Sequence, residues 1–322
     1  MTTDQPHVPV MCDRVVGLLA EAPEGVLVDA TLGAAGHARA ALVARLERHG
    51  EAHLVGLDRD PDALGLAAAN LADLAADPRV RIDLVRTRFD TLGEELDRLG
   101  VGPVAGVLLD LGISSMHVDR ADRGFSYRQD GPLDMRMDPD LPVTAGELVN
   151  ERSAGELAAI LRRYADERFA DRIARAMVAA RPLNSTTQLA EVVRDAIPQA
   201  GRRTGGHPAT RTFQALRIAV NGEIDALERI LPVALDRLEV GGIAAVLSYH
   251  SLEDRVVKRA FAEAASGCVC PPGFPVCACG RTPLVEHVVR RPERPDDAEI
   301  AINRRASAAR LRVVRRLVQD PA

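Results

Sequence analysis

The stretch GVLVDATLGAAGHARAALVARLERHGEAHLVGLD, residues 25–58, decides the fold that we expect for this chain. A short apolar run, a turn with two glycines, a helical stretch and a second apolar run follow one another at residues 26–28, 29–37, 38–48 and 53–57. This order predicts a strand–turn–helix–strand unit whose second strand ends at Asp58. A carboxylate about 20 residues after a glycine turn suits the ribose hydroxyls of a nucleoside.

Spacing alone leaves two interpretations of this unit open. Gly33 and Gly36 let the backbone bend or approach a ligand closely, but the strict G-x-G-x-x-G pattern is absent. The turn is therefore either a nucleotide site or an ordinary α/β connection. Asp58 is either a ligand to ribose or an acidic residue at the start of the next helix, stabilised by the helix dipole.

The same alternation continues along the chain and predicts a parallel, doubly wound α/β sheet. Further strands are expected at residues 79–86, 104–109, 242–249, 284–290 and 309–316. Ligands bind such sheets beyond the carboxyl ends of the strands. Those ends bring together the turn at 29–37, Asp58, residues 88–90 and residues 110–115.

A helical insertion interrupts this predicted seven-stranded domain. We expect a first core segment at 1–115, an inserted loop and helical domain at 116–215, and a second core segment at 216–322. Residues 116–140 show no regular period, and so long an irregular segment is typical of a functional loop. Helices are expected to begin near Ser153, Asp166 and Thr186.

Composition limits the class of protein. The chain has 322 residues, 47% of them hydrophobic, and a net charge of −5. No run reaches the roughly 18 apolar residues of a membrane span, and MTTDQPHVPV lacks the features of a signal peptide, so we expect a cytoplasmic protein that does not bind membranes. The net charge argues against a general nucleic-acid coating protein. Ten arginines against five acids at residues 281–316 fit either a solvated face or a contact with a polyanion.

Four cysteines form a compact cluster with the pattern C-x-C…C-x-C. In a cytoplasmic protein such thiols suggest structural zinc more than disulfides. No metal site is assigned on this pattern alone; if zinc is present, its ligands would be Cys268, Cys270, Cys277 and Cys279.

Nine motifs carry a resemblance to a known family. In order they are HVPVM (7–11), DATLGAAGH (29–37), LDRDPDA (57–63), LLDLGISS (108–115), RGFSY (123–127), PLDMRMD (132–138), HPATRTFQALRIAVNGE (207–223), SYHSLEDRVVK (248–258) and NRRASAARLRVVRR (303–316). Along nearly the whole chain this series resembles the bacterial small-subunit ribosomal RNA methyltransferases of the MraW or RsmH family. The resemblance implies a class I, Rossmann-like fold that uses S-adenosylmethionine. It further implies methylation of N4 of a decoding-centre cytosine in 16S rRNA, within the small ribosomal subunit.

The resemblance also implies the cofactor contacts. These are Ala35, Gly36 and His37 at the methionine end, Asp58 at the ribose, Phe89 beside the adenine, and Asp110 and His117 near the donor methyl. The family usually has glycine where this chain has Ala35. A positive φ there would cost alanine about 1 kcal/mol, and we expect a φ that alanine tolerates.

Candidates for contact with RNA follow from chemistry and from the motifs. The exocyclic amine of cytosine is a weak nucleophile, so alignment supplies most of the acceleration; Ser114 and His250 are candidates to contact the base. His250 is equally well explained as a hydrogen-bonded residue at a strand end. The flipped base or its neighbours would meet the RGFSY loop, and phosphates would meet nearby arginines. The residues are Arg123, Phe125, Tyr127, Arg202, Arg203 and Arg211, with core packing as the alternative for the two aromatic rings.

Two other functions remain possible at this stage. One is a nicotinamide-dependent oxidoreductase built on the same glycine turn. The other is a non-catalytic RNA-binding factor for ribosome assembly. The sequence does not indicate the oligomeric state.

Overall fold

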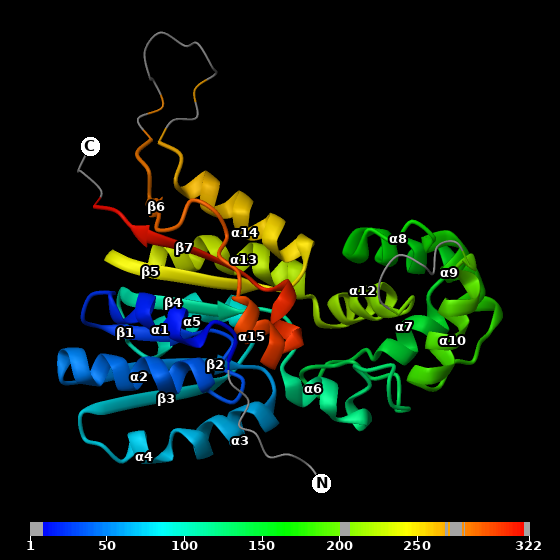
Figure 1. The fold of residues 1–322 in the computed structure, drawn as a ribbon, viewed down its shortest axis with the longest axis horizontal. Helices are drawn as coiled ribbons and strands as arrows, with labels where there is room; N and C mark the ends of the chain where they lie inside the picture. The colour runs from blue at the N-terminus through cyan, green and yellow to red at the C-terminus, as the bar shows by residue number, and fades with distance from the viewer. Residues whose placement is uncertain (1–8, 200–206, 268–269, 271–278, 280, 319–322) are drawn as a thin grey trace. The chain divides into compact units, whose positions relative to one another are not determined.

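The computed structural model describes residues 9–199, 207–267, 270, 279 and 281–318. The chain forms two compact units (Figure 1). Unit 1 comprises Met1–Gly112 and Asp225–Ala322, and unit 2 comprises Ile113–Ile224. Unit 2 starts three residues before the insertion expected at 116–215 and ends nine residues after it. The later end arises because helix α12, Thr210–Asn221, packs on the helices of unit 2.

Unit 1 contains a seven-stranded sheet with the order β3-β2-β1-β4-β5-β7-β6 (Figure 1). Strands β1 to β5 are parallel, as predicted, whereas β7 runs antiparallel to both of its neighbours. This sheet order gives the Rossmann-like α/β fold expected from the sequence. The strands are β1 Val26–Asp29, β2 Ala52–Asp58, β3 Val80–Arg86, β4 Val104–Asp110, β5 Leu238–Ser248, β6 Val285–His287 and β7 Arg310–Arg316.

Burial explains why the strands could be recognised in the sequence. Every residue of β4 before Asp110 is buried, as expected for a central strand covered on both faces. Strand β5 begins four residues before the predicted position 242, because Leu238 already pairs with Val104 ahead of an irregularity in register.

The helices of unit 1 connect the strands. Asp60 caps α3 by accepting a hydrogen bond from the Asp62 amide, and Pro61 occupies the first turn, where no amide hydrogen is needed. The helices are α1 Cys12–Ala20, α2 Gly36–His49, α3 Pro61–Asn70, α4 Ala72–Ala75, the 3₁₀ turn η1 Phe89–Thr91, α5 Leu92–Arg98, α13 Glu223–Arg237, α14 Ser251–Ala264, α15 Asp297–Ile302 and the 3₁₀ turn η3 Arg304–Ala308.

A buried arginine on α2 fixes the path into the first strand. The Arg45 side chain is 1% exposed, and its guanidinium donates to the carbonyls of Leu19, Ala22, Pro23 and Gly25 at 2.6–3.3 Å. Burial lowers the pKa of Arg45. These bonds pair the two terminal nitrogens of the buried guanidinium, although its Nε has no hydrogen-bond partner, and they hold the end of α1 against the start of β1.

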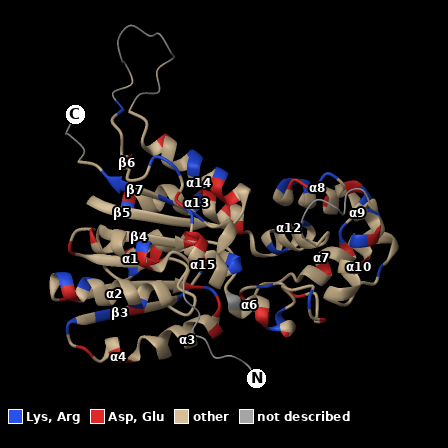
Figure 2. Cartoon of the chain, viewed as in Figure 1, with Lys and Arg blue, Asp and Glu red and all other residues tan. Residues whose placement is uncertain are grey.

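Figure 2 marks the arginines in blue and the acidic residues in red along the chain. The arginines of β7 have acidic or carbonyl partners in unit 1. Arg310 and Arg312 each lie 2.8 Å from the carboxylate of Asp254 on α14, and they hold the pKa of that carboxyl below its usual range against the opposing effect of burial. Arg316 donates to the carbonyl of Leu235. For this part of the basic C-terminal segment, a structural interpretation therefore fits better than a free surface for polyanions.

Unit 2 is helical around its own apolar core. Capping boxes at Thr144 and Ser153 begin α7 and α8, which confirms the predicted start near Ser153. The predicted start at Asp166 is wrong, because Asp166 has a left-handed φ of 47° and ends α8. The elements are α6 Ser115–Asp119, the 3₁₀ turn η2 Ala121–Arg123, α7 Ala145–Glu151, α8 Ala154–Ala165, α9 Ala170–Ala179, α10 Thr186–Ala196 and α12 Thr210–Asn221.

Candidate functional site

The turn after β1 is held in place by the carboxylate at the end of β2. Asp58 Oδ2 accepts a hydrogen bond from the Gly33 amide at 2.8 Å, and Oδ1 accepts one from the Asp60 amide at 2.9 Å. Asp58 therefore links the glycine turn to the start of α3. A carboxylate has about four acceptor positions, so these bonds are compatible with a further pair to vicinal hydroxyls.

A second carboxylate, at the end of β4, has partners from two other elements. The Tyr249 hydroxyl donates to Asp110 Oδ1 at 2.7 Å, and His37 Nδ1 lies 3.6 Å from Asp110 Oδ2. The other ring nitrogen of His37 lies 2.9 Å from the carbonyl of Val10. The Asp110 amide donates to Thr31 Oγ1 at 2.6 Å. Tyr249 lies within the SYHSLEDRVVK motif but was not among the site residues predicted from the sequence.

Asp29, at the end of β1, is the third carboxylate of this group and was also not assigned from the sequence. It is 4% exposed, and burial raises its pKa to about 7. His37 and the Thr31 amide oppose that rise, whereas the charges of Asp110 and Asp58 add to it. The signal in the sequence was its position at a strand end.

These three carboxylates follow adjacent strands, since the sheet order places β1 between β2 and β4. Their mutual repulsion raises the free energy of the ionised cluster, and a cationic ligand would relieve it. S-adenosylmethionine carries a sulfonium, an ammonium and two vicinal hydroxyls. The chemistry of Asp29, Asp58 and Asp110 therefore fits this cofactor.

Two small residues shape the turn itself. Ala35 has φ 64° and ψ 28°, a left-handed conformation, so the expectation of a φ that alanine tolerates is wrong. At Gly36 an added Cβ would lie 2.4 Å from Cγ of Pro9, so a side chain cannot fit without displacing that segment. Both positions thus require little or no side chain for steric reasons that the structure makes explicit.

The remaining predicted cofactor residues are Phe89 and His117. Phe89 is partly exposed at the start of η1, just beyond the carboxyl end of β3. His117 belongs to unit 2, where its ring lies 4.9 Å from that of Phe125 and its Nδ1 lies 3.3 Å from Ser114 Oγ. The structure thus groups the predicted residues within each unit: the carboxylates with His37 in unit 1, and Ser114 with His117 in unit 2.

Comparison with known proteins identifies the family. Residues 4–317 match the sequence pattern of the family described as "MraW methylase family". The chain belongs to the MraW methylase family. Proteins named "Ribosomal RNA small subunit methyltransferase H" are similar to it: that of Heliobacterium modesticaldum is 49% identical over 97% of this chain and 98% of its own length. The protein of that name from Acidothermus cellulolyticus is 52% identical over 97% of this chain and 94% of its own length. The oxidoreductase alternative does not fit this family.

Within this MraW-family chain, His250 has a local structural role. It caps α14, and its Nδ1 accepts from the Glu253 amide at 3.3 Å. Its Nε2 lies 3.0 Å from Glu253 Oε1 without the alignment of a hydrogen bond. Of the two interpretations of His250, the strand-end histidine with hydrogen bonds describes the structure.

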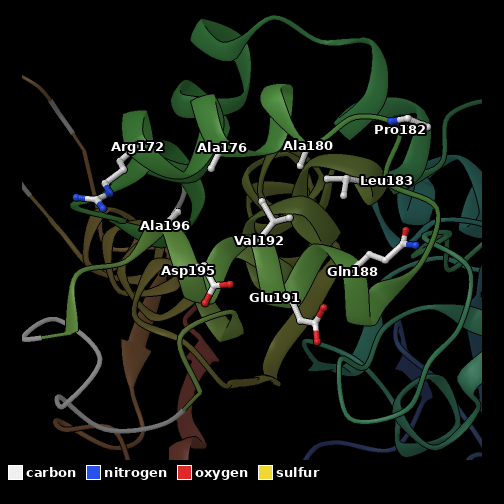
Figure 3. A pocket seen from close by; sticks show the side chains of 10 residues that line it. All are labelled: Arg172, Ala176, Ala180, Pro182, Leu183, Gln188, Glu191, Val192, Asp195 and Ala196. Atoms are coloured by element: carbon white, nitrogen blue, oxygen red, sulfur yellow. The ribbon is translucent and has the colours of Figure 1, made fainter.

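A groove lies within unit 2 of the MraW-family chain, between α9 and α10 (Figure 3). Its volume is about 640 Å³, and it contains none of the residues predicted to contact cofactor or RNA. It is lined by Arg172, Ala176, Ala180, Pro182, Leu183, Gln188, Glu191, Val192, Asp195 and Ala196. We assign no role to it.

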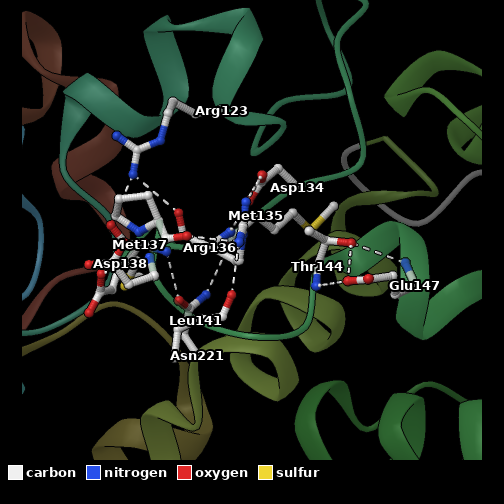
Figure 4. Close-up of polar contacts among 12 residues, drawn as sticks. Arg123, Asp134, Met135, Arg136, Met137, Asp138, Leu141, Thr144, Glu147 and Asn221 are labelled. Carbon is white, nitrogen blue, oxygen red and sulfur yellow. Dashed lines mark hydrogen bonds and ion pairs between the residues drawn. The ribbon is translucent and has the colours of Figure 1, made fainter.

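Hydrogen bonds from Arg123 within the loop at 116–140, and from Asn221 outside it, hold this loop in place (Figure 4). Arg123 donates to the carbonyls of Arg136 and Met137 at 3.1 and 2.9 Å. Asn221, at the end of α12, donates to the carbonyl of Met135 and accepts from the Met137 amide. Arg123 is therefore a brace of the loop.

The other predicted RNA contacts differ in exposure. Phe125 is 7% exposed in the core of unit 2, so core packing describes it and it offers no face for stacking. Tyr127 is partly exposed and Arg211 is exposed. Arg202 and Arg203 lie outside the described residues.

The zinc prediction remains a prediction. Cys268 and Cys277 lie outside the described residues, whereas Cys270 and Cys279 lie within them. Within the described ranges, no group of three or more His, Cys, Asp or Glu residues could hold a metal ion.

Among the helices that the structure describes, none has both the length and the apolar character needed to cross a membrane.

Proposed function

We propose that this chain transfers a methyl group from S-adenosylmethionine to N4 of a decoding-centre cytosine in 16S rRNA, within the small ribosomal subunit. The observation that carries the proposal is the cluster of Asp29, Asp58 and Asp110 at the ends of three adjacent strands of a class I methyltransferase sheet. Membership of the MraW methylase family supports methyl transfer. The names of relatives about half identical to this chain support the choice of ribosomal RNA. Such a substrate is cytoplasmic in bacteria, in keeping with the location expected from the sequence.

The cofactor would be held by residues of the turn and the strand ends. Asp58 would accept from the ribose hydroxyls, Phe89 would lie beside the adenine, and the turn at 35–37 would meet the methionine end. Asp110 would face the region of the sulfonium. When bound, S-adenosylmethionine supplies an electrophilic methyl group.

This chain contributes alignment rather than a strong base. The lone pair of the cytosine amine is delocalised into the ring, so the amine is a weak nucleophile. Most of the acceleration therefore comes from holding the amine in line with the methyl group and accepting hydrogen bonds from its N–H groups. Asp110, with Tyr249 bonded to Oδ1, is fixed at the end of β4. The Ser114 hydroxyl, in the LGISS segment that follows, is the candidate contact to the base.

The second candidate function is a non-catalytic assembly factor that binds RNA. Such a factor has no need for a clustered trio of carboxylates at the strand ends. Retention of that cluster, with His37 and Tyr249 on Asp110, favours the enzyme.

Transfer of tritium from labelled S-adenosylmethionine to small subunits tests the proposal. The subunits come from a strain that lacks this protein, and free 16S rRNA is assayed beside them. We expect label in N4-methylcytidine after digestion to nucleosides, and reduced label with Asp58→Ala at a cofactor concentration that saturates only the wild type. Label in any other nucleoside, or none, would overturn the proposal; the ratio of labelled subunits to labelled free RNA identifies the preferred substrate.

A further inference from the structure

Three aromatic rings lead from the core of unit 2 to its surface. Phe213 on α12 is 5% exposed, Tyr127 is partly exposed, and His207 is exposed. The Tyr127 ring meets Phe213 edge-on, with centroids 5.4 Å apart and an interplanar angle of 78°. The His207 ring stacks on Tyr127, with centroids 4.5 Å apart and an angle of 19°. The stack thus ends in an exposed imidazole.

Hydrogen bonds fix this exposed ring. The Ala209 amide donates to His207 Nδ1 at 3.2 Å, and the Thr210 hydroxyl donates to the His207 carbonyl at 2.8 Å. The hydroxyls of Tyr127 and Thr210 are 3.0 Å apart. Burial lowers the pKa of His207, and Arg194 lowers it further, so the ring is a neutral aromatic surface at pH 7. A ring fixed before binding loses little conformational entropy when a partner stacks on it.

Two exposed arginines adjoin the stack in sequence. Arg128 follows Tyr127, and Arg211 follows Thr210. Neither guanidinium has an ion-pair partner in the part of the chain that the structure describes. Several other arginines of unit 2 are paired with carboxylates, for example Arg136 with Asp134 at 2.8 Å.

We propose that Tyr127, His207, Arg128 and Arg211 form a stacking platform for single-stranded RNA, in which a base stacks on His207 and the two arginines meet adjacent phosphates. Stacked aromatic rings beside unpaired guanidinium groups are the combination that binds unpaired nucleotides with little sequence preference. The flat, exposed ring favours the face of a base over a peptide, because every base offers a π-face for stacking. The inference rests on the proposed function and adds a binding site to it: Tyr127 and Arg211 were predicted from the sequence, whereas His207 and Arg128 were not.

The test compares two fluorescein-labelled probes, oligouridylate of about eight nucleotides and an abasic oligomer with the same sugar–phosphate backbone. Fluorescence anisotropy gives the affinity of the full-length protein for each. We expect the wild type to bind oligouridylate about tenfold or more tightly than the abasic probe, because stacking contributes to the first only. His207→Ala and Tyr127→Ala abolish this difference, and Tyr127→Phe, which keeps the ring, preserves it.

The arginines have a separate readout. Arg128→Gln with Arg211→Gln weakens binding of both probes alike and lowers the slope of log affinity against log salt by about 1.4, or about 0.7 for each lost phosphate contact. The matched control is Arg172→Gln with Arg175→Gln, on the exposed side of α9, which leaves the slope unchanged. Equal binding of both probes by the wild type, or a base preference that survives His207→Ala in a protein with unchanged circular dichroism, would overturn the platform.

Methyl transfer to small subunits is measured on the same variants, so that two failures can be told apart. Absence of transfer by the wild type counts against the proposed function and leaves the probe experiment valid. Transfer by the wild type, with unchanged KM for subunits and unchanged probe binding in His207→Ala, counts against the platform alone.

Discussion

The hydroxyl of Tyr249 donates to Oδ1 of Asp110 over 2.7 Å, so the residue that follows β5 fixes the residue that ends β4. Burial of the phenol, reinforced by the charge and the hydrogen bond of Asp110, raises the pKa of Tyr249 well above its usual value. We therefore expect Tyr249 to stay protonated at about pH 11, one unit above the ordinary tyrosine pKa. Ultraviolet difference absorbance after a rapid pH jump counts phenolates before unfolding. The folded wild type should give one phenolate fewer than the unfolded chain, and Tyr249→Phe should remove that deficit. A deficit that persists in Tyr249→Phe would assign it to another tyrosine.

Replacement of Asp58 by alanine should weaken cofactor binding and also lower stability. The carboxylate accepts from the amides of Gly33 and Asp60, and each lost acceptor costs about 1–3 kcal/mol where the amide stays buried. We expect at least a tenfold loss of S-adenosylmethionine affinity by calorimetry. Asp62→Ala, an exposed acid in the first turn of α3, is the control for charge and should bind normally. Unchanged affinity in Asp58→Ala would remove Asp58 from the ribose site.

Replacement of Ala35 by glycine should leave the protein as stable or more stable, by up to about 1 kcal/mol. The φ of 64° costs alanine about 1–2 kcal/mol, whereas deleting its buried methyl costs about 0.8 kcal/mol. Ala38→Gly is the matched control, because Ala38 is equally buried but lies within α2, where glycine lowers stability by about 1 kcal/mol or more. Urea midpoints measure both changes. A loss of stability in Ala35→Gly as large as in Ala38→Gly would show that the left-handed strain is absent.

The stability of the protein should fall as pH rises from about 4 to about 7, through the contribution of Asp29. Its folded pKa is raised from 3.8 to about 7, so in that window the folded state binds a proton that the unfolded state has lost. The contribution is present below pH 4 and lost through pH 7, with a limit of about 1.4 kcal/mol per pH unit. Asp29→Asn should flatten this part of the profile in urea unfolding. An identical slope in wild type and variant would contradict the raised pKa.

The sequence predicted the sheet well because central strands are buried on both faces, and such burial leaves apolar runs like that of β4. The sequence predicted less well which side chains contact one another within the chain. Whether Phe125 faced solvent or core depended on packing against helices distant in sequence, and the ring proved to be buried. The positive charge of the β7 arginines was evident from the sequence, but their partner was not. Asp254, which pairs with two of them, lies more than 50 residues earlier in the chain.

In the candidate site, too, contacts between residues distant in sequence could not be predicted. Residues near the glycine turn could be assigned by motif, whereas Tyr249 meets Asp110 across 139 residues of sequence, and only the parallel pairing of β4 with β5 brings them together. The φ of Ala35 could not be derived, because a single backbone angle depends on the hydrogen bonds that close the turn.

The conformation of the segment that leads into β1 depends on one side chain, that of Arg45. Its bonds run to main-chain oxygens at positions 19, 22, 23 and 25, so these contacts themselves depend on the path of that segment and not on which side chains it carries. At position 45, in contrast, the bonds depend on the arginine side chain itself. A lysine offers three donors from a single nitrogen and cannot reproduce the planar fork of a guanidinium. The segment before β1 can thus vary in sequence as far as its packing allows, while the residue that holds it, 20 positions or more downstream, cannot.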